Sequence, residues 1–256
     1  MERIIISNMK SKFLIIFAII IFSLVSCDSD DPTSQEKITL VPISEIDLSS
    51  FLSEPSGIVY NTINNSFFVV SDTISEIFEI DFNGNLLRQI NIAANDIEGI
   101  TLSKNYDTIF VVEESDNLIT SFLINGSKIA SFRKDVSTNS SNGLEGITID
   151  NNYNTYVVNE KLPRYLMTLK NNVEVNRSEV TDVEDLSDVC YDQILDCLWI
   201  ISDESKKIIK ISKSESIISE WDLPFSKGEG ITFVQDKMYI VRDSDSKLYV
   251  FNKPGN

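Results

Sequence analysis

The sequence predicts an all-β protein, a five-bladed β-propeller whose blades are four-stranded antiparallel sheets. Three observations lead to this prediction. A short phrase, with glycine at its anchor position in four of its copies, occurs five times at nearly regular spacing, and each copy is followed by further β-rich segments. The last copy lacks its fourth strand, while a spare strand precedes the first copy. Four short strands per repeat of about 40 residues are typical of propeller blades.

The repeat is anchored by a glycine that comes directly before a short β-branched run. The phrases "EPSGIVY", "DIEGITL", "LEGITID" and "GEGITFV" contain the anchors Gly57, Gly99, Gly146 and Gly230. The phrase "DLSDVCYD" places Asp188 in the same position of the fourth copy. Successive anchors are 42, 47, 42 and 42 residues apart. This spacing predicts five blades of nearly equal length.

Within each repeat the elements follow in the same order. The first strand, such as "GIVY" or "GITF", leads through a polar turn into a second strand such as "FFVVSD" or "LWIISD". A third strand follows, such as "EIFEIDFNG" or "KIIKISKS". The first four copies add a fourth: "LLRQINI", "IASFR", "VEVNRSEV" and "IISEWDL". Short β-rich strands joined by Asn, Gly and Asp turns predict antiparallel sheets.

The two ends of the repeat array predict how the ring closes. The fifth repeat stops at "KLYVFNKPGN" without a fourth strand, and residues 37–48 ("KITLVPISEIDL") belong to no repeat. We expect this N-terminal segment to supply the outer strand of the last blade. That pairing would remove two unpaired sheet edges at once.

The first 36 residues predict export and a lipid anchor. Residues 1–26 carry three basic residues and then an apolar run, 13–25, that is short for a membrane span. Its end, "LVSC", resembles a bacterial lipobox, which implies cleavage before Cys27 and a lipid on its thiol. An ordinary signal peptide or a short anchor helix are the alternatives. Residues 27–36 are acidic and predict a flexible tether to a propeller domain of residues 37–256.

This organisation predicts a protein of the bacterial cell envelope that is held at a membrane by lipid on Cys27. The outer membrane or the cell surface is favoured over the inner membrane. The net charge is −17, and removing Arg3, Lys10, Lys12 and Glu2 of the leader leaves −19 for residues 27–256. So negative a chain repels phosphate backbones, which argues against a nucleic-acid partner.

The chain contains no histidine. This excludes Ser-His-Asp and Cys-His catalysis and histidine-ligated metals. Acid–base chemistry would fall to Asp, Glu, Lys or Tyr.

Two sets of acidic residues should meet at one mouth of the channel. Strand one lines the axis, and strand two runs antiparallel to it, so the start of one and the end of the other share a face. The acids at the start of strand one are Glu98, Glu145, Glu229 and, one position later, Asp188. The acids at the end of strand two are Asp72, Glu114, Glu160, Asp203 and Asp243.

Crowded carboxylates stay protonated or hold a cation. With oxygen ligands only, Ca²⁺ is the cation we expect, because it accepts six to eight oxygens in flexible geometry. The alternative is that these acids are solvated strand ends or turn caps.

Two further cysteines, Cys190 and Cys197, flank "YDQILD", which predicts a hairpin connection. If the two strands pair symmetrically, the thiols face each other and an oxidising envelope permits a disulfide. Two buried free thiols are the alternative.

Several phrases in order resemble the SdiA-regulated family of bacterial envelope proteins, among them "EPSGIVYN", "GLEGITID", "VVNEKLP" and "LWIISDESKKI". The resemblance covers about residues 38–251. It implies a five-bladed propeller distantly related to NHL-repeat propellers, with a calcium site on the matching acids. Glu98, Glu145, Glu160 and Glu229 match best. Asp188 departs from the pattern, because family members often carry glycine there.

The favoured function is that of a lipid-anchored propeller that binds Ca²⁺ at its channel mouth and serves as a scaffold for an unidentified ligand or protein partner. Rigid propellers position their loops well for binding. The alternative is a calcium-dependent hydrolase of the lactonase or phosphoesterase type, with Glu114 or Glu160 as base. A third interpretation is that the ion only stabilises the ring.

Overall fold

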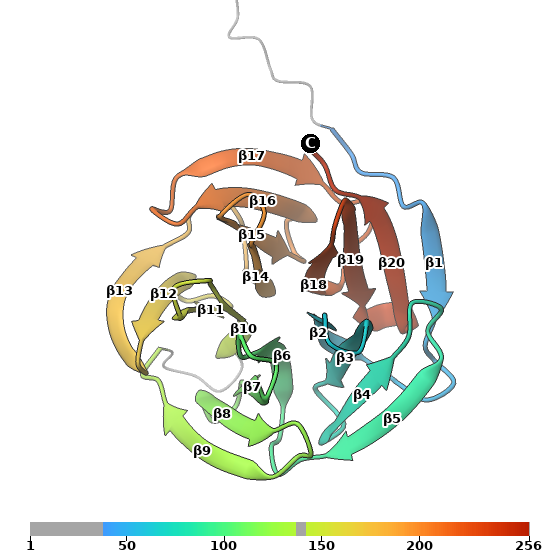
Figure 1. Ribbon diagram of the computed structural model, residues 1–256. Coiled ribbons are helices and arrows are strands. Elements are labelled where there is room, and N and C mark those ends of the chain that lie inside the picture. Colours follow the sequence, from blue (N-terminus) through green and yellow to red (C-terminus); the bar gives the residue numbers. More distant parts are fainter. Residues whose placement is uncertain (1–37, 137–141, 256) are drawn as a thin grey trace, which may run out of the picture. The chain divides into compact units, whose positions relative to one another are not determined.

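The computed structural model describes residues 38–136 and 142–255. By its internal contacts the chain divides into two units, residues 1–36 and 37–256. The predicted leader and tether, and with them Cys27, lie outside the described residues. In the second unit, five four-stranded antiparallel sheets surround a central axis (Figure 1). The prediction of a five-bladed, all-β propeller is confirmed.

The strands of each blade follow the chain from the axis outward, as Figure 1 shows. Blade I consists of β2 (Pro55–Asn61), β3 (Ser66–Ser71), β4 (Glu76–Ile80) and β5 (Leu86–Asn91). Blade II consists of β6 (Ile97–Leu102), β7 (Thr108–Glu113), β8 (Leu118–Leu123) and β9 (Lys128–Arg133). Blade III consists of β10 (Leu144–Ile149), β11 (Asn154–Asn159), β12 (Tyr165–Lys170) and β13 (Val173–Glu179).

Blade IV consists of β14 (Asp188–Asp192), β15 (Cys197–Ser202), β16 (Lys207–Ser212) and β17 (Ile217–Asp222). Blade V consists of β18 (Gly228–Val234), β19 (Lys237–Arg242), β20 (Lys247–Asn252) and the N-terminal strand β1 (Ser44–Asp47). A 3₁₀ turn, Asp243–Asp245, separates β19 from β20. Among the described residues, no helix has the length and apolarity needed to cross a membrane.

The N-terminal segment closes the ring as predicted. Strand β1 pairs antiparallel with β20, with Ser44 opposite Val250 and Asp47 opposite Lys247. Just before β1, the backbone N–H of Leu40 donates to the carbonyl of Asp222 in blade IV at 2.8 Å. The same segment therefore completes blade V and is hydrogen-bonded to blade IV.

The anchor glycines allow the inner strands to approach one another closely. A Cβ at Gly99 would lie 2.3 Å from the carbonyl oxygen of Glu145, and one at Gly57 would lie 2.6 Å from that of Glu98. A Cβ at Gly230 would lie 2.8 Å from the Cα of Gly57. No side chain fits at these distances, so glycine is required by packing at the axis.

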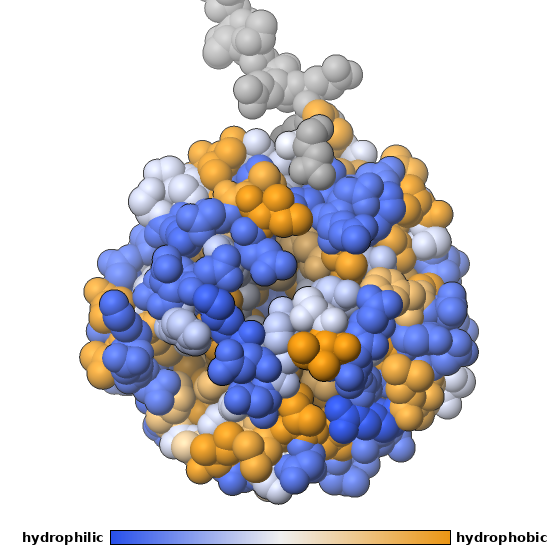
Figure 2. Space-filling model, in the orientation of Figure 1, coloured by the Kyte–Doolittle hydropathy of each residue, from blue (hydrophilic) through white to orange (hydrophobic). Residues whose placement is uncertain are grey.

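The hydrophobic core is divided among the spaces between neighbouring blades. Phe67 of blade I contacts Tyr239 of blade V, with ring centroids 4.7 Å apart. Trp199 is fully buried and stacks on Trp221 at 5.2 Å. On the face shown in Figure 2, hydrophilic side chains cover most of the surface and hydrophobic ones form separate small patches.

The hairpin between Cys190 and Cys197 forms, but its register differs from the symmetric pairing expected. Cys190 lies opposite Trp199, and Cys197 lies opposite Asp192. The turn is shorter than expected, because Tyr191 and Asp192 belong to β14. The thiols are therefore not cross-strand partners, and both cysteines are free.

Replacing Leu48 with alanine tests how much the N-terminal closure contributes. Leu48 is fully buried among residues of blades I and V, so Leu48→Ala should lower the free energy of unfolding by about 2–5 kcal/mol. The measurement is chemical denaturation, with Ile43→Ala, at a position 51% exposed, as the control. An equally small loss of unfolding free energy in both variants would contradict a stabilising role of the N-terminal segment that closes the ring.

Candidate metal site at the channel mouth

One mouth of the channel holds a cavity of about 220 Å³ that is lined mainly by acidic side chains. Every inner strand starts here and every second strand ends here, because the two run antiparallel. Seven of the nine predicted acids line the cavity: Asp72, Glu98, Glu145, Glu160, Asp203, Glu229 and Asp243. The predicted convergence of the two sets is therefore observed for these residues.

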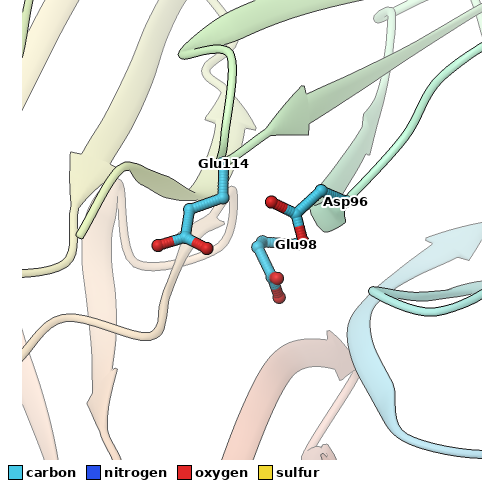
Figure 3. Close-up of side chains that lie close together, drawn as sticks. All are labelled: Asp96, Glu98 and Glu114. Atoms are coloured by element: carbon cyan, nitrogen blue, oxygen red, sulfur yellow. The ribbon is translucent and has the colours of Figure 1, made fainter. Parts of the chain in front are cut away.

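Two groups of three carboxylates lie close enough to share an ion. Asp96, Glu98 and Glu114 form one group, whose side chains converge in Figure 3. Glu114, Glu145 and Glu160 form the other, and Glu114 belongs to both. Within each group the oxygens lie within 4.8 Å of one another. Oxygens that bind one Ca²⁺ at about 2.4 Å are at most about 4.8 Å apart, so the spacing suits this ion.

Glu145 is the most unusual of these acids. It is only 9% exposed, and among the described residues it has no hydrogen bond or ion pair. Burial, followed by the charges of Glu98 and Glu114, raises the pKa of the Glu145 carboxyl well above its usual range. A buried carboxylate without a partner is costly, and a cation beside it would offset that cost.

Other acids at the mouth also have raised pKa values. Burial and the charges of Asp72 and Glu114 raise the pKa of Glu98 well above its usual range. Burial, followed by the nearby Asp203, raises the pKa of Glu229 to about 8. Asp72 also has a raised pKa, mainly through burial, and its Oδ1 is buried without a partner.

Two lysines form ion pairs with some of the acids at the mouth and leave the other acids unpaired. The ammonium of Lys161 lies 2.9 Å from Glu160 and 2.8 Å from Glu204. Lys227 lies 3.2 Å from Asp203 and 3.9 Å from Glu229. In the described part of the chain, Asp96, Glu98, Glu114 and Glu145 have no such cationic partner. Asp72 of blade I and Asp185 of blade IV also lack an ion pair among the described residues, and the most closely spaced carboxylates lie on blades II and III.

Asp188 does not line the cavity, although the sequence placed it in the predicted site. It occupies the position of the missing fifth glycine, and a Cβ at Gly146 would lie 2.5 Å from its Cα. Its carboxylate accepts hydrogen bonds from the backbone N–H groups of Val189 at 2.7 Å and Ile231 at 2.9 Å. Asp188 therefore joins blade IV to blade V at the axis.

Sequence reasoning missed several residues at this mouth. Glu54, Asp96, Asp185 and Lys227 stand three positions before their anchors, and Glu54, Asp96 and Lys227 have positive φ angles of 48°, 52° and 63°. Glu54, Asp185 and Lys227 line the cavity, as does Glu204. Aligning the repeats at this offset would have found the first four.

Comparison with known proteins gives a family and a fold. The family model described as SdiA-regulated matches residues 35–255. No curated protein matches the chain.

Several solved propeller structures are similar in fold to this chain, at low sequence identity. Virginiamycin B lyase from Staphylococcus aureus has a TM-score of 0.51 and 18% identity over 78% of this chain and 66% of that one. A luciferin-regenerating enzyme scores 0.55 at 11% identity over 84% and 96% of the two chains. A chain of a nidogen/laminin complex scores 0.58 at 13% identity over 73% and 72%. This chain thus spans about two thirds of the lyase, and identities this low show the fold alone.

The raised pKa values predict how the ion-free propeller responds to pH. A carboxyl whose pKa is higher in the folded state stabilises it fully below about pH 4.5, and this stabilisation is lost as the pH rises through the folded pKa. With Glu229 near 8, the free energy of unfolding should fall by about 2–4 kcal/mol between about pH 5 and pH 8. Thermal and chemical unfolding in EDTA measure this change.

Glu229→Gln should flatten that slope, because glutamine does not titrate. Glu76→Gln, on β4 away from the cavity, should leave the slope unchanged. Stability that rises with pH over this window would contradict the burial of protonated carboxyls at the mouth.

Proposed function

Since the chain belongs to the SdiA-regulated family, we propose that it is a lipid-anchored propeller of the bacterial envelope that binds Ca²⁺ at the acidic mouth of its channel and serves as a scaffold for a ligand or protein partner. The observation that carries the calcium proposal is Glu145, a buried carboxylate without a partner among the described residues. A dication nearby would satisfy it and its neighbours together.

The residues that would hold the ion are Glu114, Glu145 and Glu160, with Asp96 and Glu98 beside them in the second group that shares Glu114. All are hard oxygen donors, which suit Ca²⁺ better than softer transition metals. The ion would supply positive charge where Lys161 and Lys227 do not reach. It would also link blades II and III, because Glu114 directly follows β7 and Glu145 lies on β10.

The scaffold role is supported by how the mouth is built. Loops from all five blades surround the cavity, and each is held by a rigid sheet. The strongly negative chain favours a cationic ligand or a basic protein surface over nucleic acid. The lipid on Cys27 would hold this binding surface at a membrane of the envelope.

A calcium-dependent hydrolase is the second candidate. The observation that favours it is the pair of lysines in the cavity wall, Lys161 and Lys227, which could hold an anionic substrate beside the acids. The ion would polarise an ester or phosphoryl oxygen, and Glu114 or Glu160 would accept a proton. Turnover of lactone or phosphoester substrates that requires Ca²⁺ and is lost in Glu145→Gln would favour this candidate.

Calcium titration of residues 37–256 tests the site. We expect one bound ion by calorimetry and a stabilisation of about 2.7 kcal/mol at a hundredfold excess over Kd, because the ion binds the folded state alone. EDTA should remove the ion and reverse this stabilisation. Glu145→Gln should abolish binding but stabilise the ion-free protein at about pH 8, since an unpaired buried charge is removed.

The matched control is Glu76→Gln, which should bind Ca²⁺ like the parent. Absence of binding together with unfolding that EDTA does not change would refute the calcium proposal. Binding that persists in Glu145→Gln would refute the assignment of residues.

Cys27→Ser tests the anchor separately. The full chain expressed in a bacterium with a lipoprotein pathway should incorporate a labelled fatty acid and fractionate with membranes. The serine variant should lose the label, because it lacks the thiol that would carry the lipid. Cys190→Ser is the control and should keep it. A label retained by Cys27→Ser would contradict lipidation at this residue.

A further inference from the structure

A second pocket of about 160 Å³ lies at the opposite mouth of the channel. All five inner strands begin at the acidic mouth and end here, where each turns back into the second strand. One water needs about 10–15 Å³ by the same measure, so the pocket holds about 11 to 16 non-hydrogen atoms. That is the size of a single six-membered ring with its substituents.

Three buried threonines, Thr101, Thr148 and Thr232, lie at the same position of their repeats and line this pocket. The hydroxyl of Thr148 accepts the backbone N–H of Tyr191 at 3.0 Å, and that of Thr232 accepts the N–H of Tyr60 at 3.3 Å. Thr101 is only 5% exposed, yet it has no hydrogen-bond partner among the described residues. The Thr101 hydroxyl is not fully enclosed, so it is open to the pocket, where a ligand would hydrogen-bond to it.

Three of the four charged side chains that line this pocket in the described part of the chain, Asp150, Asp192 and Lys253, have a partner of opposite charge. Asp192 and Lys253 form an ion pair, and both side chains are 2% exposed. Asp150 is fully buried and pairs with Lys213 at 3.6 Å. Lys104 is exposed and donates to the carbonyl of Asn151 at 3.1 Å. A cationic ligand would therefore meet no unpaired carboxylate among the described lining residues, and an anionic ligand would meet only the exposed ammonium of Lys104.

The remaining lining is aromatic or uncharged. Tyr60, Tyr106, Tyr191 and Phe233 contribute aromatic rings, and the phenol oxygen of Tyr106 has no partner among the described residues. The amides of Gln193 and Gln235 also line the pocket. Hydroxyl and amide groups both donate and accept hydrogen bonds, whereas the rings offer apolar faces.

We propose that this second mouth binds a neutral hydroxylated ring, the chemistry of a sugar unit. Such a ligand has hydroxyl groups for Thr101, Tyr106 and the two glutamines, and an apolar ring face for the aromatic side chains. It carries no charge, which suits a pocket whose acidic side chains are each paired with a lysine. This site is separate from the acidic mouth and does not depend on the cation.

Saturation-transfer NMR on residues 37–256 tests the proposal with glucose, galactose and N-acetylglucosamine as probes. We expect saturable binding of at least one of them and none of glucuronate or of cyclohexanol, which has the ring but a single hydroxyl group. Thr101→Val should weaken binding about three- to tenfold, since it removes one hydrogen bond. Tyr106→Phe should have a similar effect.

Because the Thr101 hydroxyl has no partner among the described residues, Thr101→Val should keep the melting temperature, and weaker sugar binding then cannot come from a folding defect. Thr168→Val on β12, outside the pocket, is the matched control and should bind like the parent. EDTA should not change sugar binding. Absence of saturable sugar binding, equal binding of cyclohexanol, or binding unaffected in both pocket variants would overturn the proposal.

Discussion

The close approach of five inner strands at the axis is the constraint on which the rest of the structure depends. Gly57, Gly99, Gly146 and Gly230 permit it, because any Cβ at these positions would collide with backbone of the neighbouring blade. The residue before three of these glycines is a glutamate. Packing that brings the glycines together therefore also brings the carboxylates together.

The axis contains two kinds of buried carboxylate, and they differ in how they are satisfied. Asp188 takes the place of a glycine and accepts hydrogen bonds from backbone N–H groups of blades IV and V. Glu145 faces the cavity and has no partner in the described part of the chain. An acid held by amides contributes to the scaffold, whereas an acid left unpaired at a cavity points to a ligand outside the chain.

The two mouths of one channel have opposite chemistry because they are formed by opposite ends of the same strands. The starting ends carry acids, and Lys161 and Lys227 neutralise only part of them. The other ends carry threonines and aromatic residues, and the charges there are cancelled in pairs such as Asp192 with Lys253. A single rigid ring thus places an acidic cavity at one mouth and a mostly charge-paired pocket at the other.

The sequence by itself determined the number of blades, the order of their strands, the closing N-terminal strand and the face on which the acids gather, because all of these follow from a repeat of fixed period. Only the tertiary structure decided that Asp188 bonds to backbone amides, that Cys190 lies opposite Trp199, and that lysines neutralise one side of the mouth. Those outcomes depend on turn length and on contacts between neighbouring blades. A periodic pattern along the sequence does not determine which side chains of neighbouring blades come into contact.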